Sequence, residues 1–160
     1  MSNGFFAVGI WHPKYGVNVA GLMRSAHCFG AAYVFTVGRR YRRTSADTMN
    51  VQGLVPCFHY LTLDDLQLPS GCPLVGVELA DDAEALPNFT HPRSAVYLLG
   101  AEEHGLPRRI LEQCHQVVQI PGLRCCLNVS VAGATVLYDR MLKEHQRKAA
   151  WGVTRKKGAA

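Results

Sequence analysis

The chain has 160 residues, of which 48% are hydrophobic and 18% charged, and its formal net charge is +5. This length and composition are typical of one globular domain with a real core, and they exclude an intrinsically disordered chain. No stretch approaches the roughly 18 uninterrupted apolar residues of a membrane span, and no N-terminal pattern indicates a signal peptide, so we expect a cytoplasmic protein without a membrane partner.

Apolar runs of strand length alternate with helical patterns along the chain. Strands are predicted at Phe5–Trp11, Ala32–Val37, Val55–Leu61, Leu74–Leu79, Val96–Leu99 and His115–Ile120. Helices are predicted at Gly16–Phe29, at Arg108–Gln113 and from Leu127 to about Lys148, with short helical pieces in Asp64–Leu68 and Asp81–Pro92. This alternation predicts an α/β fold with a mostly parallel sheet. We expect one domain over 1–148, followed by a flexible basic tail at 149–160.

Positive charge is concentrated in two segments. Residues 140–160 carry seven Lys and Arg against one acid, Glu144, and a second cluster of arginines flanks Tyr41. Basic segments on a near-neutral body indicate a polyanionic partner, nucleic acid before membrane, although a solvated face explains them as well. The residues predicted to contact RNA are Arg39, Arg40, Arg42, Arg43, Arg155, Lys156 and Lys157.

The six cysteines show neither a C-x-x-C motif nor the paired spacing of a metal site. Reduced thiols in a cytosolic protein are therefore the expected state, and no metal is predicted.

Three polar loops follow predicted strands or open predicted helices, at 13–24, 100–107 and 121–130. In parallel sheets ligands bind at the carboxyl ends of strands, so these loops are candidates for one site. Asn128 and Ser130 lie where the last helix begins, and they either cap that helix or help to bind an electron-rich group.

Two further features point to the same loops. Gly100 and Gly105 bracket Glu102 and permit a close approach of the backbone to a ligand, although the spacing does not match a dinucleotide fingerprint. Arg24 follows the apolar Leu22 and Met23, and a buried arginine requires an anionic partner, either Glu102 or a phosphate.

Three segments form a pattern in a fixed order. They are Asn18-x5-Arg24-x4-Phe29-Gly30, then Leu99-Gly100-Ala-Glu102-x-x-Gly105-Leu106-Pro107, and then Ile120-Pro121…Leu127-Asn128-Val129-Ser130 followed by a helix with Tyr138. In order and approximate spacing they resemble the three motifs of the SpoU (TrmH-type) branch of the SPOUT RNA methyltransferases. The chain is most similar to the minimal TrmL-like members, which methylate a ribose 2′-hydroxyl at the tRNA wobble position.

The resemblance implies a fold, a cofactor and a site. The α/β sheet would end in a deep trefoil knot, an exception to the rule that chains avoid knots. The protein would be a homodimeric RNA 2′-O-ribose methyltransferase. S-adenosylmethionine would lie in the knot against Val77, Glu78, Gly100, Glu102, Gly105, Ile120, Cys126 and Leu127. The catalytic group would be Arg24, Asn18, Glu102, Asn128 and Ser130, with Arg24 positioning the phosphate and the hydroxyl.

One residue and one loop depart from the family pattern. Cys126 stands where the family has a serine, and the loop from Ile120 to Cys126 looks shorter than the common form. A thiol is a weaker hydrogen-bonding group than a hydroxyl. These departures leave open a non-catalytic RNA-binding module beside the enzyme acting on tRNA, and ribosomal RNA is an alternative substrate. A metal or redox protein built on the cysteines is a more distant alternative.

Overall fold

The computed structural model describes residues 4–42, 53–122 and 124–157, with side chains described as far as residue 150. Among these residues no helix is long and apolar enough to cross a membrane.

One parallel sheet runs through the described part of the chain, with its strands in the order β3-β2-β1-β6-β4-β7-β5. Every pairing between neighbouring strands is parallel, so the predicted α/β fold with a mostly parallel sheet is confirmed. The strands are β1 (Phe6–Trp11), β2 (Val34–Val37), β3 (Cys57–Tyr60), β4 (Leu74–Val77), β5 (Glu84–Ala85), β6 (Ala95–Leu99) and β7 (Gln116–Gln119). Strands β1, β2, β4 and β6 are buried along their whole length because both faces of the central sheet are covered.

Helices α1 (Gly16–Phe29) and α3 (Val129–Lys157) cover one face of the sheet and pack against each other. A Cβ atom on Gly133 of α3 would overlap Leu22 Cδ1 of α1, so this glycine allows the two helices to approach closely. The short helix α2 (Arg108–Leu111) and the 3-10 turn η2 (Leu63–Asp65) belong to the apolar core of the opposite face, through Ile110 and Leu63.

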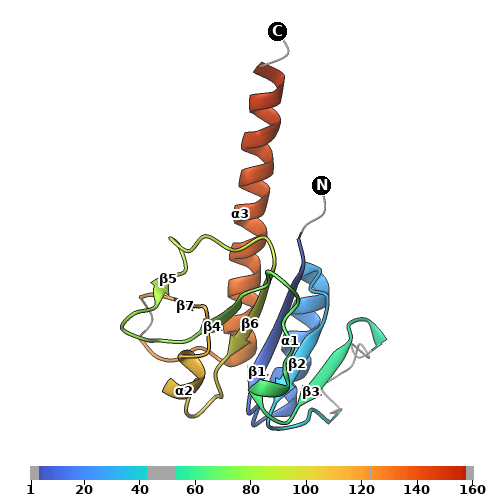
Figure 1. The fold of residues 1–160 in the computed structure, drawn as a ribbon, viewed down its shortest axis with the longest axis vertical. Helices are drawn as coiled ribbons and strands as arrows, with labels where there is room; N and C mark the ends of the chain where they lie inside the picture. Colours follow the sequence, from blue (N-terminus) through green and yellow to red (C-terminus); the bar gives the residue numbers. More distant parts are fainter. Residues whose placement is uncertain (1–3, 43–52, 123, 158–160) are drawn as a thin grey trace.

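Two local predictions are wrong. The last helix does not end near Lys148 but continues to Lys157, far beyond the sheet, so most of the predicted tail is helical (Figure 1). The ion pair of Lys148 with Glu144, at 3.2 Å and a spacing of four residues, stabilises the helix just before this extension. The short helix expected in 81–92 is absent from that segment, where β5 pairs with β7 instead. Pro87 and Pro92 disfavour a helix there, and the N–H of Leu86 bonds to the carbonyl oxygen of Gln119 at 2.7 Å.

The carboxyl ends of the parallel strands all lie at the same end of the sheet, the lower end in Figure 1. The loops that follow β1, β4, β6 and β7 leave from this end, and α1 and α3 begin there. The three polar loops singled out in the sequence are therefore neighbours in space.

Candidate active site

A cavity of about 310 Å³ opens among the loops that follow β4, β6 and β7 and reaches the first turn of α3. All eight residues predicted to hold the cofactor line this cavity: Val77, Glu78, Gly100, Glu102, Gly105, Ile120, Cys126 and Leu127. The sequence motifs thus converge on one space, although β4 and α3 are more than fifty residues apart along the chain.

The side chain of Glu78 joins two of the loops around the cavity. Its carboxylate accepts hydrogen bonds from the backbone N–H groups of Leu79, at 2.9 Å, and Leu106, at 2.6 Å. A Cβ atom on Gly100 would lie 2.5 Å from Glu78 Oε2, and one on Gly105 would overlap it. The two glycines therefore make room for this carboxylate. Sequence reasoning placed Glu78 at the cofactor through its backbone and missed this role of the side chain.

Glu102 is held at the junction of the cavity and helix α1. Its Oε1 accepts a hydrogen bond from Asn18 Nδ2 at 2.8 Å, and its Oε2 accepts one from the backbone N–H of Lys14 at 3.0 Å. Burial is the largest single influence and by itself raises the pKa of Glu102. The hydrogen bonds from Asn18, Lys14, Tyr15 and its own backbone together outweigh burial, so the pKa lies below its usual value of 4.5. Glu102 is thereby fixed as an ionised acceptor.

Lys14 is a site residue that sequence reasoning missed. Besides its backbone contact to Glu102, its Nζ forms an ion pair with Glu103. Hydrogen bonding to Glu103 is the main reason that the pKa of Lys14 is raised. The segment before α1 is thus tied to the loop after β6 by two adjacent carboxylates. The only sequence signal for this contact was a lysine within the first polar loop.

A chain of hydrogen bonds continues from Glu102 to the start of α3. Asn128 Nδ2 donates to Asn18 Oδ1 at 2.8 Å, and Asn128 Oδ1 accepts from the backbone N–H and the hydroxyl of Ser130, at 2.9 and 2.7 Å. Asn18 is only 6% exposed, so its amide is fixed by Glu102 on one side and Asn128 on the other. Asn128 both satisfies the first turn of α3 and links that helix to α1.

Arg24 occupies a different position from the one expected. It is exposed on α1 rather than buried among apolar side chains, and the hydrogen bonds described for Glu102 come from Asn18, Lys14 and Tyr15. Arg24 lies one turn along α1 from Gly21, where a Cβ atom would come within 3.1 Å of Ser130 Oγ. The arginine is therefore exposed one turn beyond the point where α1 approaches Ser130.

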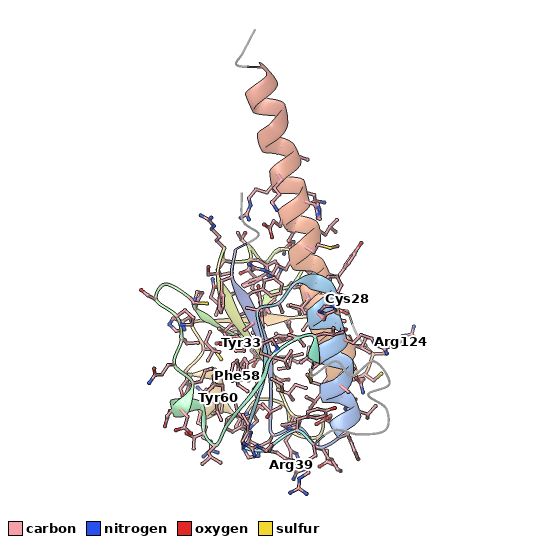
Figure 2. All side chains as sticks on the ribbon, turned by 90° about the vertical axis from the view of Figure 1, so that its right-hand side faces the viewer. Cys28, Tyr33, Arg39, Phe58, Tyr60 and Arg124 are labelled. Atoms are coloured by element: carbon pink, nitrogen blue, oxygen red, sulfur yellow. The ribbon has the colours of Figure 1, made fainter. Side chains whose placement is uncertain are left out.

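The two basic segments lie at opposite ends of the molecule. Arg39, Arg40 and Arg42 are exposed and line an open hollow of about 480 Å³ together with Lys14, near the site. Arg39 is at the bottom of Figure 2, whereas α3 ends at the top. Arg155, Lys156 and Lys157 belong to the last turns of α3, and Arg43 lies outside the described residues. In a single chain Arg39 therefore lies far from the last turns of α3.

All six cysteines, each within the described residues, are free thiols. No group of three His, Cys, Asp or Glu side chains in the described part of the chain is arranged to hold a metal ion. Cys126 is exposed and belongs to the cavity wall.

Replacing Asn18 with leucine is expected to destabilise the protein in a pH-dependent way. The variant removes a hydrogen bond to a carboxylate and leaves Asn128 without its acceptor, at a cost of about 1–3 kcal/mol. The pKa of Glu102 is depressed in the folded state. The stabilisation by the hydrogen bond from Asn18 to the Glu102 carboxylate is therefore present above the usual pKa of 4.5 and is lost as the pH falls through the folded-state pKa. Thermal melts of both proteins between pH 7 and pH 3 should show the gap in Tm narrowing. A difference in Tm that stays constant over this range would mean that Asn18 does not stabilise the ionised form of Glu102.

Two curated proteins are similar to most of this chain. The tRNA (guanosine(18)-2′-O)-methyltransferase of Escherichia coli K12 is 28% identical over 129 residues, which cover 76% of this chain and 56% of that protein. The mouse protein tRNA (guanosine(18)-2′-O)-methyltransferase TARBP1 is 30% identical over 133 residues, which cover 76% of this chain but 8% of the relative. The chain therefore spans about half of one relative and a small part of the other.

A solved structure shows the same fold. The SpoU methyltransferase AviRb from Streptomyces viridochromogenes, in complex with the cofactor AdoMet, superposes with a TM-score of 0.79 at 21% identity, over 91% of this chain and 63% of that one. The sequence model of the SpoU rRNA methylase family matches residues 6–138, a range that includes all three motifs and the whole cavity wall. The chain belongs to the SpoU rRNA methylase family.

Proposed function

We propose that this protein is an S-adenosylmethionine-dependent RNA 2′-O-ribose methyltransferase that acts on tRNA. One observation carries the proposal: the cavity that unites the eight predicted cofactor residues adjoins the hydrogen-bonded chain of Glu102, Asn18, Asn128 and Ser130. A space for a cofactor thus borders a set of fixed polar groups that can orient a second substrate.

The cavity wall suits S-adenosylmethionine in charge and in shape. It contains the carboxylates of Glu78, Glu102 and Glu103, and no lysine or arginine is among its described residues. Such a wall favours a cation and offers acceptors for hydroxyl and amino groups. Apolar side chains, including Leu99, Ile120 and Val129, complete the cavity and suit an aromatic base. When bound, the cofactor would supply an electrophilic methyl group on a positively charged sulfur.

The residues of the chain would act mainly by positioning. Transfer of a methyl group to a ribose hydroxyl is an in-line displacement, so the orientation of the hydroxyl controls much of the rate. Asn18, Asn128 and Ser130 are held in fixed positions by their mutual hydrogen bonds and present polar groups between α1 and α3. Arg24 would bind the phosphate beside the acceptor ribose, since a guanidinium stays protonated and recognises phosphate well.

The names of the relatives support tRNA as the substrate. Both of these relatives are named for the ribose of guanosine 18 in tRNA, whereas the resemblance to the TrmL-like members implies the tRNA wobble position. The family description names ribosomal RNA. We therefore propose tRNA as the substrate, with ribosomal RNA as the second candidate, and we propose that the protein acts in the cytoplasm.

The decisive experiment is methyl transfer with purified protein. S-adenosylmethionine carrying a deuterated methyl group would be incubated with total tRNA and, in parallel, with ribosomal RNA. Mass spectrometry of the digested RNA then identifies the labelled nucleoside and maps its position. We expect a labelled 2′-O-methylnucleoside in tRNA. Cofactor binding by calorimetry without transfer to either RNA would instead support a non-catalytic RNA-binding module.

We further propose a homodimer that forms through the exposed side of α1 and α3. Five large apolar side chains on these helices or just before α3 are exposed, and we call them the apolar stripe: Val17, Leu127, Val131, Tyr138 and Leu142. The members on α3, Val131, Tyr138 and Leu142, recur at spacings of seven and four residues, which is the pattern of a helix that packs against a partner helix. Leu127 also lines the cavity, so a partner on this stripe would lie close to the cofactor.

Replacing Val131 with glutamate is expected to convert the dimer into a monomer, because it places a charge in the centre of the stripe. Light scattering at micromolar concentration should report twice the chain mass of 17.6 kDa for the unmodified protein and the single mass for the variant. Gln67→Glu adds the same charge at an exposed residue after η2 and should leave the mass unchanged. A monomeric unmodified protein would contradict this arrangement.

The trefoil knot is likewise a proposal. Strand β7 lies between β4 and β5, although β5 directly follows β4 in the chain. The connection from Glu78 to Ala83 must therefore arch over the carboxyl end of β7, where Val118 and Gln119 pair with β5. The segment that leaves β7 for α3 begins at this arch, which supports threading of the C-terminal helix through it.

A further inference from the structure

Aromatic side chains gather at the outer edge of the sheet, away from the cavity. Tyr33 precedes β2, and Phe58 and Tyr60 belong to β3, the edge strand. The rings of Tyr33 and Phe58 lie 5.3 Å apart between centroids, and those of Phe35 and Tyr60 lie 6.0 Å apart. Figure 2 shows Tyr33, Phe58 and Tyr60 one below another along the sheet. We call these three residues the aromatic edge.

Phe58 is the exposed member of the aromatic edge, whereas Tyr33 and Tyr60 are half-buried and pack against the core with one side. Phe35, its neighbour on β2, is fully buried and fills the core of this face, whereas Phe58 is 49% exposed on the outermost strand. An exposed phenylalanine on an edge strand is an aggregation hazard that proteins normally avoid. An exposed aromatic surface of this kind is typical of a binding site.

Positive charge begins where the aromatic edge ends. The N–H of Gly38 bonds to the carbonyl oxygen of Tyr60 at 2.9 Å, so Arg39 leaves β2 beside the last aromatic residue. In Figure 2 Arg39 lies below Tyr60, at the carboxyl ends of the strands. The acids of this region, Asp64 and Asp65, belong to η2, where Asp65 accepts from the hydroxyl and the N–H of Thr62. A polyanion is therefore favoured on the side of the arginines.

We propose that the aromatic edge is a stacking surface for unpaired bases of the RNA, with the phosphates next to these bases held by Arg39, Arg40 and Arg42. The inference rests on the proposed function, because it assigns a second contact region to the same substrate. Aromatic side chains beside a basic segment are the usual means of binding single-stranded RNA. Phe58 and Tyr60 point to the same side of β3, about 7 Å apart along the strand, which suits successive bases. The arginines also border the hollow near Lys14, so RNA on this surface leads toward the active site.

RNA binding by variants of Phe58 tests the proposal. Fluorescence anisotropy would follow the binding of a single-stranded RNA of twelve nucleotides and of tRNA at several salt concentrations. Phe58→Ala and Phe58→Leu should each weaken binding about 5- to 150-fold, the loss of one stacked base, with an unchanged salt dependence. Arg39→Ala should weaken binding and reduce the slope of log K against log salt by about 0.7. Leu54→Ala removes an exposed apolar side chain beside the strand and should change neither quantity. Thermal melts would confirm that the variants are folded.

Phe58→Leu separates stacking from a general apolar contact, because leucine keeps the bulk and loses the aromatic face. Wild-type affinity in both Phe58 variants, in a protein that methylates tRNA normally, would overturn this inference and leave the proposed function standing. If the Phe58 variants kept their RNA affinity but changed their mass in light scattering, the aromatic edge would be a contact with a second copy of the chain. This result would also overturn the inference. An unmodified protein that neither binds nor methylates any RNA would refute the proposed function together with this inference.

A tryptophan in place of Phe58 gives a direct readout of contact. A nucleobase stacked on this ring should quench its emission as RNA is added, beyond any change from the native Trp11 and Trp151 in the unmodified protein. Leu54→Trp is the matched control beside the strand and should show little additional quenching. Equal quenching of both reporters would contradict a specific stacking surface.

Discussion

Replacing Gly105 with alanine is expected to reduce the affinity for S-adenosylmethionine about 10- to 100-fold. Gly105 has a φ of +60°, a backbone conformation that residues with a side chain rarely adopt, and a Cβ atom added there would overlap Glu78 Oε2. The carboxylate would have to leave the N–H of Leu106, which it contacts at 2.6 Å, and the loops after β4 and β6 would separate. Isothermal titration calorimetry with S-adenosylmethionine and S-adenosylhomocysteine measures the loss.

A second glycine isolates the steric effect from the backbone strain. Gly71 has a φ of +69°, but nothing lies within 4 Å of its Cβ position. Gly71→Ala should therefore lower Tm through strain alone and leave the affinity for the cofactor unchanged. Equal affinities of the Gly105 variant and the unmodified protein would show that the cofactor does not bind in this cavity.

The position of the cavity could be predicted from the sequence because two simple patterns determine it. Uninterrupted apolar runs such as Leu74–Val77 predict strands buried on both faces, and buried parallel strands bring their following loops to one edge. The glycines at 100 and 105 marked where the backbone must approach another group closely. What they approach, the carboxylate of Glu78, could not be read from the sequence because the contact joins residues more than twenty positions apart.

Other features depended on tertiary contacts that no local pattern encodes. A two-residue strand such as Glu84–Ala85 has no periodicity of its own and exists because β7 offers an edge with which to pair. The neighbouring Leu22 and Met23 suggested that Arg24 is buried, but they face the core while Arg24 faces solvent. On a helix adjacent residues point in different directions, so the composition around a residue says little about its own exposure.

The chain of hydrogen bonds from Glu102 to Ser130 shows why the motifs fall so far apart in the sequence. Asn18 lies at the start of α1, Glu102 after β6 and Asn128 before α3, and each side chain fixes the next at 2.8 Å. Each of these polar groups satisfies another, so the network is stable only when all three elements are in place. The site is therefore a product of the complete fold.

Replacing Arg24 with alanine is expected to lower the turnover of RNA methylation about 10²- to 10³-fold, the effect of removing one group that stabilises the reacting arrangement. Cofactor affinity should not change, because Arg24 is exposed on α1 and is not among the residues that line the cavity. A steady-state methylation assay with tRNA, together with calorimetric titration of S-adenosylmethionine, would separate the two quantities.

Two matched variants show whether the effect of Arg24 is specific. His27→Ala removes an exposed side chain one turn further along α1 and should retain normal turnover. Arg24→Lys keeps the charge but loses the planar fork that binds two phosphate oxygens at once, so its turnover should lie between those of Arg24→Ala and the unmodified enzyme. Full turnover in Arg24→Ala with unchanged RNA affinity would remove the arginine from the mechanism. The orientation of the ribose would then depend on Asn18, Asn128 and Ser130, whose mutual hydrogen bonds already fix them between the two helices.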